Sequence, residues 1–348
     1  MNLILDIDPS GIHKPNHIIQ HPLPWISCFT PRQHILADKV CQEDNDFFLV
    51  HWPFKSEKQR QMFLDMDLSR WSTSACANAL DSRIQIHARF NTVLFLIDDM
   101  IDKMGIVQGQ KYINTLIHSV ETNTAPSSPD TASQILATLF AQITLADKPK
   151  ASDLWTALVP FWRAQTESRR DRTRSLDEYL AWRVTDIGHF VTGALGRWAI
   201  DASIPPHEEA LIRSIDANIG AQVVLVNDLF SWEKELLDAA KMDSEVVNAV
   251  GLVMRLENVD AGAAQRMLAI KVKELEDKHV ELLDGKMENL SRDSKVYVRF
   301  LENMAAGNES WSRGTARYNV VGGQQVRPEV ENISFRVFDL EGDKGCDI

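Results

Sequence analysis

Two stretches of the chain are apolar on every helical face and turn polar at their carboxyl ends. One covers residues 93–97 (VLFLI) and runs into Asp98; the other covers residues 221–226 (AQVVLV), where Gln222 is the single polar residue, and runs into Asn227. A helix that is apolar all round belongs in a protein core. The pattern therefore predicts two buried helices, each with polar side chains at its carboxyl end.

Capping signals predict where further helices begin. A Ser or Thr followed three residues later by Glu or Gln can satisfy two free backbone N–H groups of a first helical turn. Helices are predicted from Thr30, from Ser56 to about Leu80, from about Ser82, and from Ser175 to Gly188. The prolines at 205 and 206 should open a long helix that carries the second apolar run, and helices should continue from Gly251 to Met304.

The chain reads as one domain. Residues 1–29, with the scattered His13, His17 and His21, are expected to form an irregular arm across the helices rather than a metal site. Breaks at residues 121–134 and 148–152 have apolar helices on both sides, so neither resembles a domain linker. A helical domain is expected over residues 30–318, and a mobile tail over 319–348.

The polar end of the second run has a regular spacing. Asn227, Ser231 and Glu235 stand at i, i+4 and i+8, so they drift only about 80° around a helix and share one face. Three oxygen-bearing groups on a buried face are costly unless they have partners. A hard cation such as Mg²⁺ prefers an amide oxygen, a hydroxyl and a carboxylate. Alternatively, this helix end emerges into water.

The first run ends in a cluster of carboxylates. Asp98, Asp99 and Asp102 lie within one turn, where like charges repel by a few tenths of a kcal/mol per pair when exposed. A divalent cation would remove that repulsion. An acidic helix end in solvent is the alternative.

Composition limits the partners. The 348 residues carry a formal net charge of −12, which argues against nucleic-acid binding. A phosphate site would have to supply its own positive charge, although salt screens the overall repulsion beyond about 8 Å. Four cysteines without a C-x-x-C pair suggest neither a disulfide framework nor zinc. The N-terminus does not read as a signal peptide and no run of about 18 apolar residues exists, so a cytoplasmic protein is expected.

Together the two polar ends resemble a known pair of motifs. Residues 227–235 match N-D-x-x-S-x-x-K-E at every fixed position, and residues 98–102 match D-D-x-x-D. The chain thus resembles class I terpene synthases, in particular fungal-type sesquiterpene cyclases, over about residues 30–320. The resemblance implies an all-α, single-domain helical bundle around a central apolar cavity. It also implies three Mg²⁺ ions that clamp a diphosphate, held by Asp98, Asp99, Asp102, Asn227, Ser231 and Glu235, with Asp98 the firmest ligand of its motif.

Other residues match further positions of the family. Arg183, 44 residues before Asn227, resembles its diphosphate-sensing arginine, Asp186 the linker aspartate, and Ile187 the effector position. Gly188 could permit the helix break that this role requires. The resemblance implies that the diphosphate is bound by Arg183, Lys234, Arg317 and Tyr318. The basic run 169–174 is interpreted as a solvated turn, with a phosphate site as the alternative.

Helical phase and the resemblance suggest the cavity walls. Phe95 lies on the Asp98 face, one turn deeper, and Trp311 matches a family position near the cavity; aromatic faces can stabilise a passing carbocation. Plain core packing is the alternative for both. Gly220 and Val224 lie below Asn227 and are small enough to leave room. Asn91, two turns below Asp98, either tunes the pocket or is a satisfied core amide.

The function implied is that of a carbon–oxygen lyase acting on phosphates. We expect Mg²⁺-dependent ionisation and cyclisation of farnesyl diphosphate to a sesquiterpene hydrocarbon or alcohol, by a monomer or homodimer. Diterpene cyclisation of geranylgeranyl diphosphate is the near alternative. A chain-elongating prenyl diphosphate synthase would need a second D-D-x-x-D, and a non-catalytic diphosphate-binding protein would not need both motifs intact. No histidine stands out as a general base.

Overall fold

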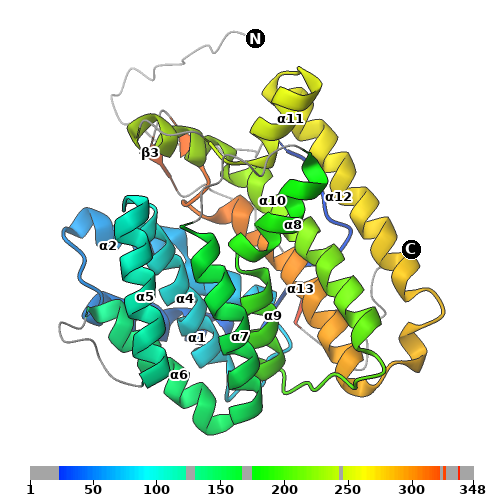
Figure 1. Ribbon diagram of the computed structural model, residues 1–348, viewed down its shortest axis with the longest axis horizontal. Coiled ribbons are helices and arrows are strands. Elements are labelled where there is room, and N and C mark those ends of the chain that lie inside the picture. The colour runs from blue at the N-terminus through cyan, green and yellow to red at the C-terminus, as the bar shows by residue number, and fades with distance from the viewer. Residues whose placement is uncertain are drawn as a thin grey trace, which may run out of the picture.

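Helices make up almost all regular structure in the residues described by the computed structural model, which are 23–122, 130–166, 175–242, 246–321, 324–326 and 336–337 (Figure 1). The all-α prediction is confirmed. The helices are α1 Ala37–His51, α2 Glu57–Met66, α3 Leu68–Ala75, α4 Ile84–Ile101, α5 Ile106–Thr122, α6 Thr131–Ala146, α7 Lys148–Ala164, α8 Leu176–Asp186, α9 His189–Ala199, α10 Glu209–Met242, α11 Ala249–Glu257, α12 Ala261–Leu283 and α13 Arg292–Gly314, with a 3₁₀ turn at Met287–Asn289.

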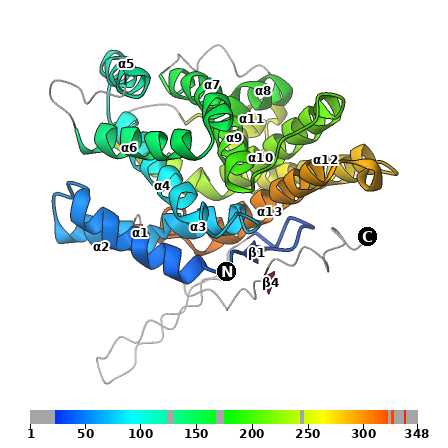
Figure 2. The ribbon, with the colours of Figure 1, turned by 90° about the horizontal axis from the view of Figure 1, so that it is seen from below.

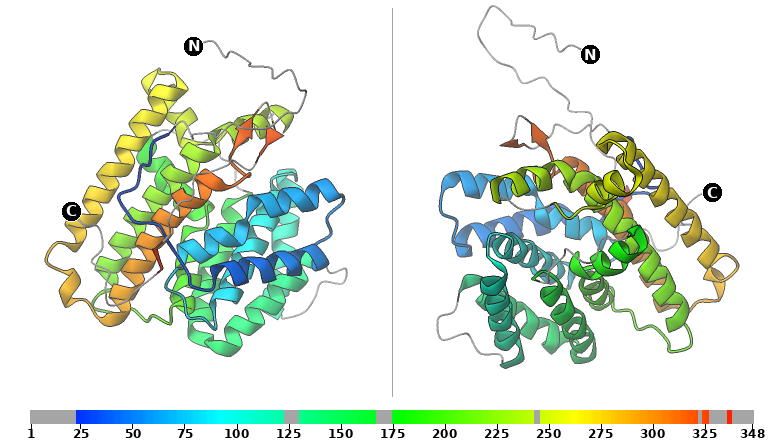
Figure 3. Two further views of the ribbon diagram at one scale, coloured as in Figure 1. Left: turned by 180° about the vertical axis from the view of Figure 1, so that it is seen from behind. Right: turned by 45° about the horizontal axis from the view of Figure 1, so that its top comes forward.

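The long helix α10 lies at the centre of the array. It packs against α12, α13, α8 and α11, while α13 also contacts α3, and α3 contacts α4 (Figures 1 and 3). The second apolar run of the sequence, residues 221–226, lies on α10. It is buried on opposite faces of the helix, since Val224, Leu225 and Val226 are all fully buried. This stretch, which is apolar on every face, is therefore part of a buried helix, as the sequence predicted.

Two predicted N-cap serines are present, and one predicted helix start is wrong. Ser56 accepts from the Gln59 N–H at 3.3 Å and Ser175 from the Glu178 N–H at 3.2 Å. No helix begins at Thr30; Arg32–Gln33 form a short strand, β1, that pairs in parallel with β4 (Arg336–Val337), and α1 starts at Ala37 (Figure 2). The His34 N–H donates to the Thr73 carbonyl of α3 at 2.9 Å, so a tertiary contact replaces the first turn.

The helix predicted from Ser56 to Leu80 is interrupted at Asp67. This residue adopts a left-handed conformation (φ 48°) between α2 and α3. The Trp311 indole N–H donates to the carbonyls of Met66 and Asp67 at 3.0 and 2.9 Å, and the Thr315 hydroxyl donates to Met66 O at 2.7 Å. The carbonyls at the break thus accept hydrogen bonds from Trp311 of α13 and from Thr315, which follows α13. The sequence around Asp67 does not indicate these distant donors.

Residues 23–29 cross the back of the bundle, over α13 and α12 (Figure 3, left). Two buried glutamates hold this segment. Glu309 accepts from the N–H groups of Ile26 and Ser27 at 2.9 and 2.8 Å, and Glu276 from the Ser27 hydroxyl at 2.7 Å. The remainder of the predicted arm, with His13, His17 and His21, lies outside the described residues, as do the loop 123–129 and the basic run 169–174.

Past α13 the described chain forms a small hairpin, β2 Val320–Val321 with β3 Gln324–Gln325. The Gln325 side chain donates to the Arg317 carbonyl at 2.8 Å, which ties the hairpin to the residues before it. Cys41 and Cys76 are buried free thiols. Among the helices that the structure describes, none has the length and apolar character needed to cross a membrane.

Candidate active site

A cavity of about 250 Å³ lies between α4, α10, α13 and the junction of α8 with α9. Both polar motifs open into it, from opposite sides. The cavity is lined by motif residues and basic side chains from four places in the chain. These are Asp98 of α4 and its C-cap Asp102; Arg183, Asp186 and Ile187 at the end of α8; Asn227, Ser231, Lys234 and Glu235 of α10; and Arg317 and Tyr318 after α13. The structure thus brings together nearly all residues that the sequence proposed for the site.

The α4 side of the cavity holds Asp98 at the end of the first apolar run. One oxygen of Asp98 accepts from Gln165 Nε2 at 2.8 Å. Burial and the neighbouring Asp102 raise the pKa of Asp98 to about 7, against a smaller opposing effect of Arg317. Asp102 caps α4 and is exposed. A cation bound in the cavity would oppose both effects and favour the ionised form of Asp98.

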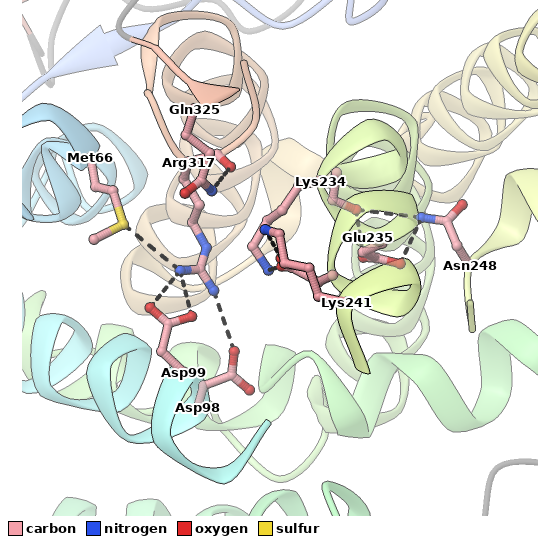
Figure 4. Close-up of polar contacts among 11 residues, drawn as sticks. Met66, Asp98, Asp99, Lys234, Glu235, Lys241, Asn248, Arg317 and Gln325 are labelled. Carbon is pink, nitrogen blue, oxygen red and sulfur yellow. Dashed lines mark hydrogen bonds and ion pairs between the residues drawn. The ribbon is translucent and has the colours of Figure 1, made fainter. Parts of the chain in front are cut away.

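The α10 side presents Ser231 and Glu235 one turn apart. Figure 4 shows Glu235 beside Asn248. The Ser231 hydroxyl donates to Glu235 Oε1 at 2.7 Å, and Asn248 Nδ2 donates to Glu235 Oε2 at 3.2 Å. Burial, and then the charge of Asp228, raise the pKa of Glu235 to about 7. Burial is therefore the first cause of the raised pKa of both carboxyls that face the cavity, Asp98 and Glu235.

Asn248 is a site residue that the sequence analysis missed. Its side-chain oxygen caps α11 by accepting from the Val250 N–H at 2.8 Å, while its amide reaches the Asp228 carbonyl at 3.0 Å and the carboxylate of Glu235. The available signal was local, since Asn directly before an apolar helix is a typical N-cap. Nothing local indicated that the same amide would hold a residue of α10.

Asp228, the second residue of its motif, has no exposed surface and does not line the cavity. It accepts from the Ala249 N–H at 2.8 Å and from the Tyr179 hydroxyl, and it lies 3.5 Å from Arg183. This carboxylate therefore fixes α8 and the start of α11 against α10.

The predicted helix break after α8 is confirmed. Arg183 donates to Asp186 at the end of α8, Ile187 follows, and Gly188 adopts a left-handed conformation (φ 81°) before α9 begins at His189. A Cβ at Gly188 would lie 3.1 Å from the Phe161 ring. The break leaves Ile187 and Gly188 on the cavity wall beside Arg183.

Arg317 and Tyr318 follow α13 and contact both motifs. Arg317 donates to both oxygens of Asp99 at 2.9 Å and lies 3.5 Å from Asp98 (Figure 4). The Tyr318 hydroxyl accepts from Asn227 Nδ2 at 2.9 Å. Burial alone would lower the pKa of Arg317, but the carboxylates of Asp99 and Asp98 raise it above its usual value. The segment after α13 therefore bridges the two sides of the cavity, and Asp99 is turned to it rather than to the lining.

The deeper cavity wall is aromatic. Phe95 lies 5.7 Å from Trp71 and 5.6 Å from Trp311 between ring centroids. The expectations for Gly220 and Val224 are wrong, because neither residue lines the cavity and Val223 does. The polar stripe runs along the i±4 row through Asn227 and Ser231, so the wall continues to residue 223 rather than 224. Asn91 also lines the cavity, and its amide donates to the His87 carbonyl at 3.0 Å.

The donor chemistry fits Mg²⁺ shared with a ligand rather than a complete protein cage. Within the described part of the chain, no three Asp, Glu, His or Cys side chains gather into a metal-binding group. The cavity instead offers carboxylate, hydroxyl and amide oxygens on two separate walls. Mg²⁺ commonly takes one or two carboxylates and completes its shell with water and substrate phosphates. A cation in the cavity would lower the raised pKa of Asp98 and of Glu235.

The chain resembles known proteins along most of its length. Residues 89–278 match the family model described as terpene synthase family 2, C-terminal metal binding. Aristolochene synthase of Aspergillus terreus is 33% identical over 90% of this chain and 98% of its own. The (+)-aristolochene synthase TS1 of Penicillium expansum is 33% identical over 86% and 92%. The crystal structure of aristolochene synthase from Penicillium roqueforti superposes with a TM-score of 0.74 at 29% identity, over 84% of this chain and all of that one.

Proposed function

The chain belongs to the terpene synthase family, and we propose that it ionises and cyclises farnesyl diphosphate to a sesquiterpene with release of diphosphate. The observation that carries this proposal is the cavity itself, where two walls of hard oxygen donors and three basic side chains face one another above an aromatic pocket. The substrate comes from the relatives, whose names describe synthases of a sesquiterpene.

We assign the metal ligands to both walls. Asp98 and Asp102 would hold Mg²⁺ from α4, and Asn227, Ser231 and Glu235 from α10, with three ions in all. Bound Mg²⁺ supplies the positive charge that stabilises a departing diphosphate. Asp99 belongs to the same motif but acts through Arg317 in the geometry described above.

The basic residues around the mouth bind the diphosphate. Arg183, Lys234 and Arg317 line the cavity, and each is held by a carboxylate that can share it with a ligand. Tyr318 adds a hydroxyl donor. Positive groups fixed where charge develops lower the barrier because they need little reorganisation. Asp186 fixes Arg183, and the helix break at Gly188 would let the Ile187 carbonyl face the substrate.

The apolar part of the cavity folds the chain of the substrate and excludes water. Phe95, Trp71 and Trp311 offer ring faces to a cation, each worth roughly 1–2 kcal/mol or more when desolvated.

The test is incubation of the purified protein with farnesyl or geranylgeranyl diphosphate, in Mg²⁺ or in EDTA. Released diphosphate and volatile products are measured together. The proposal expects one sesquiterpene-forming reaction with farnesyl diphosphate that EDTA abolishes. Cyclic C20 products alone would favour the diterpene alternative, and longer linear diphosphates would favour chain elongation. Tight binding of the substrate without turnover would indicate a non-catalytic binding protein.

A further inference from the structure

Asn91 is a polar residue on the deep wall of the cavity for which the ionisation chemistry has no use. It lies on α4 four residues before Phe95 and seven before Asp98, so the three side chains share one face of the helix. All three line the cavity. Seven residues of an α-helix span about 10 Å along its axis, so Asn91 lies that far below Asp98. Asn91 is therefore at the depth of the hydrocarbon chain rather than of the diphosphate.

The hydrogen bonds of Asn91 fix the orientation of its side-chain amide. Nδ2 donates to the His87 carbonyl at 3.0 Å, one turn back along α4, and lies 3.5 Å from His87 Nε2. Because a carbonyl only accepts, the amide nitrogen must be on this side, and Oδ1 points elsewhere. Burial lowers the pKa of His87 to about 3, so its ring is neutral and puts no positive charge beneath the amide.

The oxygen of this amide is open to the cavity. Oδ1 of Asn91 accepts no hydrogen bond from the described residues, yet it is not one of their polar atoms that are both unpaired and sealed from solvent. The residue is 4% exposed and lines the cavity. The accessible surface that Oδ1 retains is therefore part of the cavity wall.

A second asparagine in the same wall is satisfied by the protein itself. Asn308 of α13 accepts from the Trp71 indole N–H at 3.2 Å, and its amide donates to the Val223 carbonyl at 3.4 Å. Both ends of this side chain are thus occupied by the fold. Only the nitrogen of Asn91 is occupied in this way. A satisfied core amide therefore describes Asn308 and not Asn91.

An unpaired amide oxygen in this wall has opposite effects on the substrate and on the cation formed from it. A hydrocarbon chain that displaces water leaves Oδ1 without a donor, which is unfavourable. A carbocation is attracted to the negative end of the amide dipole, and this attraction is strong in a dry cavity of low dielectric constant. Oδ1 of Asn91 thus interacts better with the charged intermediate than with the neutral substrate, as catalysis requires.

We propose that Asn91 is a specificity-determining residue, whose Oδ1 stabilises positive charge on the part of the hydrocarbon chain that lies against it and so selects the carbocation that gives the product. This inference rests on the proposed function. Oδ1 adds a fixed negative dipole one helical turn below the ring of Phe95, and charge beside it is favoured over charge elsewhere on the chain. No bond to Asn91 forms or breaks, and its oxygen takes no proton.

Two variants separate the oxygen of Asn91 from the shape of its side chain. Asn91→Leu is similar in size and removes the oxygen, whereas Asn91→Asp keeps an oxygen in the same place. Asn218→Leu is the matched control. The amide of Asn218, on α10, also donates to a backbone carbonyl, that of Leu275 at 2.7 Å, but its Oδ1 is sealed from solvent and the residue does not line the cavity. A purely structural role of a buried amide would make Asn91→Leu and Asn218→Leu alike.

The experiment incubates each protein with farnesyl diphosphate and Mg²⁺ in ¹⁸O-labelled water. Products are identified by gas chromatography with mass spectrometry and expressed per diphosphate released, so that a loss of ionisation is counted separately. We expect the ratio of the main wild-type product to all others to fall about tenfold or more in Asn91→Leu, because removal of one preorganised dipole costs roughly 10²–10³-fold in rate. Its diphosphate release should stay near the wild-type rate. Asn91→Asp and Asn218→Leu should keep the main product.

The wild-type product spectrum in Asn91→Leu would overturn the inference, as would the same shift in Asn218→Leu or loss of the main product in Asn91→Asp. A wild-type product that carries ¹⁸O, and that Asn91→Leu replaces with unlabelled olefins, would also overturn it, since the amide would then hold a reacting water. If Asn91→Leu fails to fold, Asn91→Ala removes the same oxygen and carries the same expectation. A wild-type protein that releases no diphosphate would refute the proposed function instead, before any variant is made.

Discussion

The guanidinium of Arg317 donates to both carboxylate oxygens of Asp99, each at 2.9 Å. The pair joins the segment after α13 to the end of α4. The hydroxyl of the adjacent Tyr318 accepts a hydrogen bond from the side-chain amide of Asn227 on α10. Arg317 thus provides part of the positive charge that bound Mg²⁺ would bring to the cavity. Binding of metal and diphosphate must redistribute these contacts.

Arg317→Gln should destabilise the metal-free protein by about 1.5–3 kcal/mol, because hydrogen bonds to a charged group are lost near two carboxylates. Mg²⁺ should raise the melting temperature of this variant more than that of wild type. Thermal unfolding with and without Mg²⁺ measures both effects. Arg213→Gln, which removes an exposed pair with Glu209, is the control and should change stability by under about 1 kcal/mol.

Asn248 should tune metal affinity through Glu235. Asn248→Ala removes the N-cap of α11, at a cost of about 0.5–2 kcal/mol, and frees Glu235. Asn248→Asp keeps a capping oxygen but places a second carboxylate beside Glu235. We expect Asn248→Ala to need more Mg²⁺ for half-maximal turnover and to lose the cap. Asn248→Asp should need less Mg²⁺, because the second carboxylate attracts the cation. Equal Mg²⁺ requirements in all three proteins would show that Asn248 has no part in the site.

Gly188→Ala should destabilise the protein more than Gly285→Ala does. Both glycines have positive φ, 81° and 61°, so a Cβ costs roughly 1–2 kcal/mol at either position. Only Gly188 has a neighbour in the way, the Phe161 ring at 3.1 Å, whereas Gly285 has open space. Denaturant unfolding measures the difference, and turnover should fall only for Gly188→Ala. Equal losses of stability would mean that Phe161 moves aside without cost.

Stabilisation by Mg²⁺ should depend on pH. The pKa of Glu235 is raised from 4.5 to about 7 in the folded state, so the folded protein holds this proton more tightly than the unfolded chain. That contribution to stability is complete below about pH 4.5 and is lost as the pH rises through about 7. Mg²⁺ binds the ionised carboxylate, so its effect on melting temperature should be larger near pH 8 than near pH 6. A larger effect near pH 6 would contradict this assignment.

Regular spacing made the centre of the site predictable. The i, i+4 rows of Asn227, Ser231 and Glu235, and of Asp98 and Asp102, place side chains on one face wherever a helix forms. The Gly188 break follows from the freedom of glycine at positive φ. Each of these conclusions depends on residues close together in the sequence.

Long-range contacts account for what the sequence did not predict. The break at Asp67 depends on Trp311 and Thr315, about 245 residues further along the chain, and the strand at Arg32 depends on Arg336. Asn248 and the His189–Asp216 pair likewise join different helices. Capping boxes and apolar periodicity depend only on neighbouring residues, so they do not reveal such distant partners. This explains why a helix was predicted at Thr30 and does not form.

The account requires both walls of the cavity to hold one metal–diphosphate cluster, and calorimetric titration with inorganic diphosphate tests this most directly. Wild type should bind diphosphate in Mg²⁺ and not in EDTA, and either Asp98→Ala on α4 or Asn227→Leu on α10 should abolish most of that binding. Asp46→Ala, which removes an exposed carboxylate that does not line the cavity, should bind as wild type does. Undiminished Mg²⁺-dependent binding in both Asp98→Ala and Asn227→Leu would contradict the account.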